Sequence, residues 1–97
     1  MPKLISKNEL SWTPCGYRNF SLGSTATGIP NLPADAIMAI IHVEGISCRW
    51  RDDGIAPTAS VGMPLTSITP FTYFGDLSAL SFISSGGTVN ISLSLYS

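Results

Sequence analysis

The segment 89–96 constrains the fold most, because it alternates strictly between apolar and polar residues. Its apolar positions are Val89, Ile91, Leu93 and Leu95, and its polar positions are Asn90, Ser92, Ser94 and Tyr96. Successive side chains of a strand point to opposite faces of a sheet, so this period of two predicts a strand with one buried face. A chain with such a strand needs a second layer to cover the apolar side.

Further strands are predicted upstream of this segment. Residues 17–22 alternate, with Tyr17, Asn19 and Ser21 opposite Arg18, Phe20 and Leu22. The run AIMAIIHVE at 36–44 is continuously apolar, as expected of a central strand covered on both faces, although a helix is the competing interpretation. Its β-branched residues and the following Gly45 favour a strand.

The clearest alternation of the middle region lies at 46–51. Ile46, Cys48 and Trp50 are expected to face the core, while Ser47, Arg49 and Arg51 face solvent or a partner. The sequence DDG at 52–54 then predicts a turn, in which Gly54 is free to take a positive φ. Residues 55–64 are predicted to form a connection with short strand character at 58–61.

Two more strands are predicted at 71–74 (FTYF) and within 77–84, where Leu80 and Phe82 share one face. Turn signals stand at 75–76 and 85–87. Short strands with turns about every 8–12 residues predict an all-β fold, a compact antiparallel β-sandwich or small barrel of about six to eight strands.

The proline- and glycine-rich first third differs from the rest. Segment 23–33 is predicted to be a loop or extended arm that could contact a partner. We expect a single β domain over 1–97, with an arm and first strand in 1–35 and the β core in 36–97. A chain of 97 residues buries only about 60–65% of its unfolded surface, so oligomerisation would help it.

Composition excludes several classes of function. The net charge of −1 and the 11% of charged residues offer no electrostatic basis for binding nucleic acid. The longest apolar run, 36–41, is too short for a membrane span, and the first residues lack the apolar segment of a signal peptide. We therefore expect synthesis in a cytoplasm, where Cys15 and Cys48 stay reduced; a disulfide between them is possible but unsupported.

No catalytic or metal-binding arrangement stands out. His42 is the only histidine and lies inside an apolar run, which is typical of a packed or surface residue. Asp52 and Asp53 are adjacent, so their side chains should diverge; a calcium loop is conceivable, but a polar turn is preferred. We expect no enzyme, no cofactor and no metal.

Candidate partner contacts are therefore sought among arginines and aromatic residues. Arg49 and Arg51 could bind an acidic partner or form a solvated face, and Trp12 and Tyr17 could be exposed. Five aromatic residues could form a sugar-stacking platform, but core or oligomer packing is the preferred interpretation. These five are Trp12, Trp50, Phe71, Tyr73 and Phe74.

A family resemblance rests on three strings: EGISCRWRDDGIAPT at 44–58, ASVGMPL at 59–65 and GDLSALSFI at 75–83. They resemble small β-structured virion proteins of tailed bacteriophages, encoded near the head or tail genes. In those proteins a strand ends in a basic residue, an acidic–glycine turn and a Pro-Thr step, and the final strand ends in Tyr, as 89–96 does here. The resemblance covers about 36–96 and leaves the N-terminal third unmatched.

The resemblance implies a phage structural protein located in the virion. We expect a capsid decoration (cement) protein that binds the major capsid protein or other virion proteins between shell subunits. A homo-oligomer is expected, with a trimer favoured. The first alternative is a tail, neck or baseplate protein, and the second is a carbohydrate-binding β module.

Overall fold

The computed structural model describes residues 3–5, 9–45, 47–66 and 70–97. Within these residues it contains nine strands and one short 3₁₀ helix, η2 (Leu77–Ala79). The strands are β1 (Lys3–Ile5), β2 (Glu9–Ser11), β3 (Pro14–Leu22), β4 (Met38–Glu44), β5 (Ser47–Arg51), β6 (Met63–Thr66), β7 (Phe71–Phe74), β8 (Ser81–Ser84) and β9 (Val89–Tyr96).

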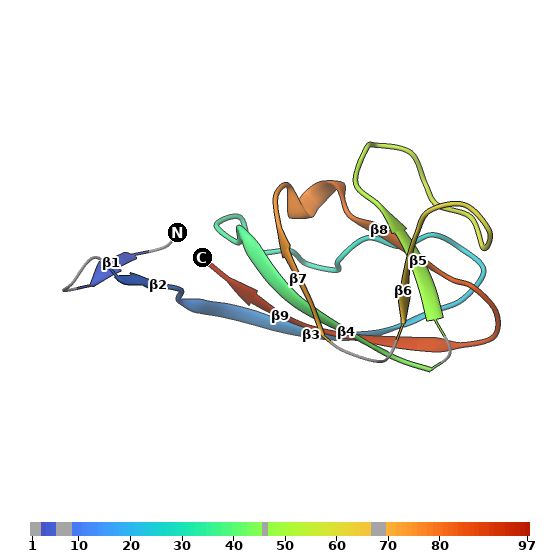
Figure 1. Cartoon of the computed structure of the whole chain (residues 1–97), viewed down its shortest axis with the longest axis horizontal. Helices are drawn as coiled ribbons and strands as arrows, with labels where there is room; N and C mark the ends of the chain where they lie inside the picture. The colour runs from blue at the N-terminus through green and yellow to red at the C-terminus, as the bar shows by residue number, and fades with distance from the viewer. Residues whose placement is uncertain (1–2, 6–8, 46, 67–69) are drawn as a thin grey trace.

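Seven of these strands form an antiparallel β-sandwich of two sheets, which confirms the predicted fold class. One sheet has the order β3-β9-β4-β7 and the other the order β6-β5-β8. Figure 1 shows the smaller sheet packed over one half of the larger one. Strands β1 and β2 form a separate two-stranded hairpin that projects from one end of the sandwich (Figure 1).

Strand β9 is the centre of the larger sheet, as its alternating sequence requires. It pairs with β3 on one side and with β4 on the other. Its four apolar residues are all fully buried, and its polar residues lie on the opposite face. The prediction of a strand with one apolar face is confirmed here.

Strand β4 is a strand rather than a helix, as favoured, but it is not covered on both faces. Ala39, Ile41 and Val43 face the smaller sheet and are buried, whereas Ile40 is 36% exposed on the other side. The prediction of two covered faces is wrong because the second sheet packs on one side only. Continuous hydrophobicity in β4 therefore leaves apolar surface on the outer side of the sheet.

The connection 52–62 folds over the smaller sheet and contains no strand, so the predicted strand character at 58–61 is wrong. Thr58 and Val61 exchange backbone hydrogen bonds of 2.8 and 3.3 Å. The Thr58 hydroxyl also accepts from the amides of Ser60 and Val61, at 3.4 and 3.0 Å. This local side-chain bonding competes with extended pairing, and strand β6 begins only at Met63.

The predicted strand within 77–84 begins later than expected. Asp76 caps η2, because its Oδ1 accepts from the amide of Ser78 at 3.1 Å, and strand β8 starts at Ser81. Leu80 and Phe82 are both buried, as predicted. The predicted turn at 85–87 is also present, closed by the Ser84 hydroxyl, which donates to the Gly87 carbonyl at 2.7 Å.

Segment 23–33 is a loop, as predicted, and it packs against its own sandwich. Thr27 forms an isolated bridge with Phe82 through two hydrogen bonds of 2.8 Å. Farther along, Ile29 and Leu32 pack against the core. The loop thus covers the part of the larger sheet that the smaller sheet leaves open.

Candidate interaction face

The outer face of the four-stranded sheet is the candidate site. We define the outer face by the side chains of this sheet that point away from the smaller sheet. Strand register brings residues from four separate segments into rows across it. The residues are Tyr17, Asn19 and Ser21 of β3, Asn90, Ser92, Ser94 and Tyr96 of β9, Met38, Ile40, His42 and Glu44 of β4, and Thr72 and Phe74 of β7.

One half of the outer face is polar and internally hydrogen-bonded. The Asn19 amide donates to the Ser92 hydroxyl at 2.7 Å, and the Ser21 hydroxyl donates to the Asn90 side-chain carbonyl at 2.9 Å. His42 lies opposite Ser92 in the register. This half presents hydrogen-bonded amide and hydroxyl groups together with the carboxylate of Glu44, which lies opposite Asn90 in the register.

The other half is aromatic, and we call it the aromatic patch: Trp12, Tyr17, Ile40 and Phe74. Tyr17 and Phe74 are each 61% exposed. The ring of Trp12 lies 5.6 Å from that of Phe74, which is within the range of favourable aromatic pairs. Met38, which lies between Phe74 and Tyr96 in the register, is the buried residue of this face.

The five aromatic residues that could have formed one sugar platform are divided between two places. Trp50 lies 5.3 Å from Phe71 and 5.8 Å from Tyr73, ring centre to ring centre, on the inner sides of the sheets. Of the five, only Phe74 belongs to the outer face, and Trp12, which precedes β3, packs against it. The split follows from strand parity, because Tyr73 and Phe74 are neighbours and point to opposite faces.

Both candidate arginines of β5 are engaged with their own chain. Arg49 is half-buried, and its guanidinium donates to the carbonyls of Ala59 and Gly62 at 3.2 and 2.9 Å. The segment 52–62 therefore covers the face on which solvent or a partner was expected. Their role as partner contacts stays a prediction.

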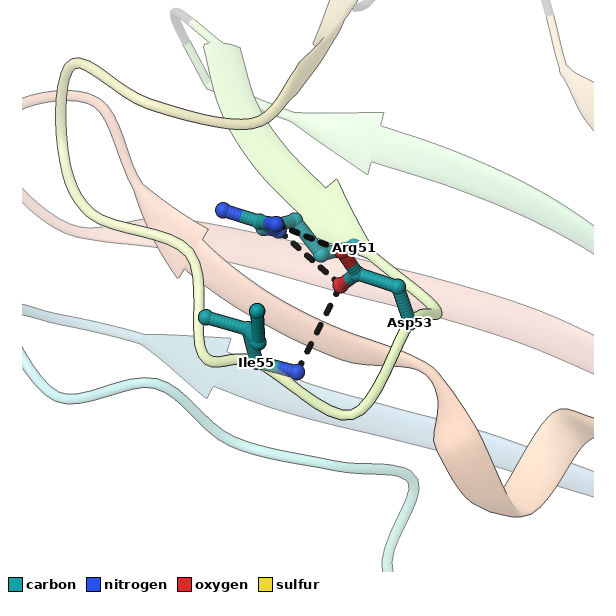
Figure 2. A network of polar contacts seen from close by, with 3 residues as sticks. All are labelled: Arg51, Asp53 and Ile55. Atoms are coloured by element: carbon teal, nitrogen blue, oxygen red, sulfur yellow. Dashed lines mark hydrogen bonds and ion pairs between the residues drawn. The ribbon is translucent and has the colours of Figure 1, made fainter.

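Arg51 forms a two-bonded ion pair with Asp53 in the turn after β5 (Figure 2). Oδ1 of Asp53 also accepts from the amide of Ile55 at 3.4 Å. The hydrogen bond from Arg51 lowers the pKa of the Asp53 carboxyl, and the same bond raises the pKa of Arg51. The pair stabilises the predicted turn, in which Gly54 has a φ of +84°.

Asp52 and Asp53 diverge, as predicted for adjacent residues. Oδ2 of Asp52 accepts a 2.7 Å hydrogen bond from the Tyr73 hydroxyl, which links the two sheets. Burial, followed by this carboxylate, raises the pKa of Tyr73 to about 12. In the described part of the chain no group of three or more His, Cys, Asp or Glu residues is placed to hold a metal ion.

The two cysteines are free thiols and form no disulfide. Cys48 is fully buried, and burial raises its pKa to about 11. Cys15 is half-buried near the start of β3.

A cavity of about 540 Å³ lies among three connections that the sequence analysis did not bring together. Its lining comes from 23–26, 56–59 and the end of β8 with its turn, and it consists mainly of Gly, Ala, Ser and Thr. These segments are far apart in the sequence and carry no common motif, so no sequence signal indicated the cavity.

Comparisons with protein-family models, curated proteins and solved structures find no match to this chain. Among the residues that the structure describes, no helix has the length and hydrophobicity needed to cross a membrane.

Proposed function

We propose that this chain is a structural protein of a tailed-bacteriophage particle that decorates the capsid, binding where neighbouring shell subunits meet. The aromatic patch carries this proposal. Trp12, Tyr17 and Phe74 are presented beside a hydrogen-bonded polar surface on a paired sheet. Aromatic residues are enriched in the centre of protein interfaces and polar groups at the rim, and a rigid platform loses little entropy on binding.

The resemblance to phage virion proteins supports the class of function. Its residues 44–65 correspond to one unit of the fold: β5, the Arg51–Asp53 turn, the connection 52–62 and β6. The hydrogen bonds of Arg49 hold this unit together. The residues that carry the resemblance thus form one local unit of this chain, and the outer face supplies the proposed contact.

Stabilisation of the shell would follow from mass action. A protein that binds only the assembled lattice lowers the free energy of that lattice relative to its free subunits. Many weakly bound copies suffice, because each occupied site adds its own contribution. The major capsid protein is the expected partner.

The test is the copy number of this chain in purified particles, measured relative to the major shell protein. A ratio that matches a repeating lattice site supports decoration. A few copies per particle would favour the alternative of a tail, neck or baseplate protein. Absence from the particles would contradict the virion proposal.

The second alternative, a carbohydrate-binding module, is favoured by one observation. The exposed ring of Phe74, with the half-buried Trp12 packed against it, has the ring surface needed to stack on a sugar. Quenching of tryptophan fluorescence by a host polysaccharide, lost in Phe74→Ala, would support it. An unchanged spectrum across a panel of polysaccharides would count against it.

A further inference from the structure

The four edges of the two sheets differ in how well they are protected against pairing with another strand. The edge of β8 is covered, since Thr27 bridges Phe82 and the Ser84 amide donates to the Gly23 carbonyl at 3.2 Å. Strand β6 carries Pro64, which has no amide hydrogen to donate. Strand β7 is only four residues long, between Pro70 and Gly75.

Strand β3 is different, because most of its edge is long and open. Pro14 and a bulge at Cys15 interrupt its beginning, but Gly16 to Leu22 pair regularly with β9. On the other side of this stretch, no strand and no backbone amide of another segment is bonded within the described residues, and only the Tyr17 carbonyl is occupied, by the guanidinium of Arg18 at 2.8 Å. Such an edge is a template for a further strand.

We propose that β3 pairs antiparallel with β3 of a second copy of this chain. An antiparallel strand pairs with its own copy about a two-fold axis, so the product is a dimer with one continuous sheet. This replaces the trimer that the sequence favoured. The proposal is independent of capsid decoration.

The register that pairs all seven residues is centred on Asn19. It places Asn19 opposite Asn19 of the second copy, Tyr17 opposite Ser21 and Arg18 opposite Phe20. The seven pairs span roughly 23 Å. On the outer face they would cover part of Tyr17, and on the inner face they would complete the burial of Phe20, which is only partly buried in the single chain.

The charges of β3 are compatible with self-pairing. Arg18 is the only charged residue of the strand. Its guanidinium donates to the carbonyls of Tyr17, Pro30 and Asn31 in its own chain. In the Asn19-centred register the two arginines do not face each other, and the outward residues beside the axis are neutral. Like charges opposite one another, which protect many natural edges, are therefore absent from this pairing.

The experiment is sedimentation equilibrium on the whole chain, with Asn19→Lys and Asn19→Glu as paired variants. The wild-type chain is expected to dimerise, and each variant is expected to raise the dimer dissociation constant at least about tenfold, because two like charges meet at the axis. An equimolar mixture of the two variants is expected to restore the dimer. Circular dichroism checks that each variant is folded.

Two control variants separate edge pairing from other contacts. Ser60→Lys adds a charge on the exposed 52–62 connection, and Ser94→Lys adds one on the outer face within β9. Neither should dissociate an edge-paired dimer. A wild-type monomer, a trimer, a dimer unaffected at Asn19, or a dimer broken by Ser94→Lys would overturn the proposal. Particle copy number does not depend on these results, so the two proposals fail separately.

Discussion

Arg49 and Arg18 perform the same task in the two sheets of the sandwich. Each lies on a strand, and its guanidinium binds backbone carbonyls of a long connection. Arg49 binds carbonyls of the connection 52–62, and Arg18 binds carbonyls of the connection 23–37. Connections without strand partners leave carbonyls that need donors. A guanidinium supplies several donors in a fixed geometry, which suits this role.

Replacing Arg49 by Ala is expected to destabilise the fold, because the carbonyls of Ala59 and Gly62 lose a charged donor. The free energy of unfolding should fall by about 2 kcal/mol. Urea denaturation measures the change. Arg51→Ala is the matched control and should have a smaller effect, because its ion pair with Asp53 is at the solvent-exposed surface. Equal losses in the two variants would contradict the role given to Arg49.

Gly62 is expected to tolerate alanine much less well than Gly54, although both have a positive φ. A Cβ at Gly62 would lie 3.1 Å from the Cβ atoms of Arg49 and Pro57, whereas one at Gly54 would meet nothing within 4 Å. Gly62→Ala should therefore lower the unfolding free energy by about 1–3 kcal/mol and Gly54→Ala by about 1. Thermal unfolding of the two variants tests which substitution costs more stability. A smaller loss for Gly62→Ala than for Gly54→Ala would contradict the close packing at Gly62.

Burial of the Cys48 thiol is expected to make the protein less stable in alkali. Burial raises the pKa of the Cys48 thiol from its ordinary value of 9.0 to about 11 in the folded chain. Its contribution is thus complete below pH 9 and is lost as the pH rises toward 11, by up to about 1.4 kcal/mol per pH unit. Urea denaturation between pH 8 and 10 measures the loss of unfolding free energy. This pH range lies below the pKa of Tyr73, which is raised from 10.0 to about 12. Cys48→Ala should reduce the decrease of unfolding free energy with pH. An unchanged slope in this variant would contradict the role given to the Cys48 thiol.

At the scale of elements, the β1–β2 hairpin is distinct from the sandwich. Its strands pair only with each other, and the first backbone link between the N-terminal region and the sandwich in the described residues is the Thr13–Ser97 pair, with bonds of 3.0 and 2.8 Å. The hairpin projects beyond this link (Figure 1). An element with so few connections contributes little to the cooperative unit.

Deleting residues 1–11 is therefore expected to leave the melting temperature within about 4 °C of the full chain. Deleting residues 1–16 should lower it further, because that removes the Thr13–Ser97 pair and the beginning of β3. Differential scanning calorimetry of both truncations distinguishes the cases. A large loss from the shorter deletion would show that the hairpin stabilises the sandwich.

At the scale of the whole molecule, the two sheets differ in what covers their outer sides. The connection 52–62 folds over the smaller sheet and buries Pro57 and Ile83 there. The larger sheet has no comparable cover within the described residues, and Tyr17, Ile40 and Phe74 of its aromatic patch stay exposed. An exposed apolar group on a paired sheet is typical of an interaction surface.

The double variant Trp12→Ala/Phe74→Ala is expected to weaken binding to particles that lack this protein at least about tenfold, because interface energy concentrates in aromatic anchors. Its melting temperature should change little, since Phe74 is mostly exposed. Val61→Ala, an exposed apolar residue on the 52–62 connection, is the control and should bind normally. Co-sedimentation with particles gives the affinities, and equal binding by all three proteins would remove the patch from the interface.

Much of the fold could be predicted from local patterns. The alternation at 89–96 and 17–22 identified two neighbouring strands with their buried faces, and the glycine turns at 54 and 86–87 were found because they depend on residues close in sequence. The predictions failed where contacts with a distant segment determine the local structure or its burial. The turn at 58–61 is stabilised by its own threonine and by Arg49, and the run at 36–44 gave no sign that one side of β4 lacks a cover.

The candidate site was predictable only in part. Trp12 and Tyr17 are predicted contacts and lie in the aromatic patch. Phe74 is predicted only as one of five possible sugar-stacking residues, and nothing in the sequence marks Ile40 as a member of the patch. Their grouping depends on the strand order β3-β9-β4-β7, which no local pattern contains. Arg49 and Arg51 were identified from alternation alone, which cannot show that a later connection occupies the same face.

The sequence by itself determined that this chain forms an all-β fold of short antiparallel strands, because hydrophobic period and turn chemistry act over a few residues. That the strands form a sandwich and not a barrel was decided by the tertiary structure. Tertiary structure alone decided which faces are covered, which aromatic rings meet and which sheet edge stays open. Those outcomes depend on the order in which strands join a sheet and on where long connections lie. Both are set by packing between segments that are far apart in the chain.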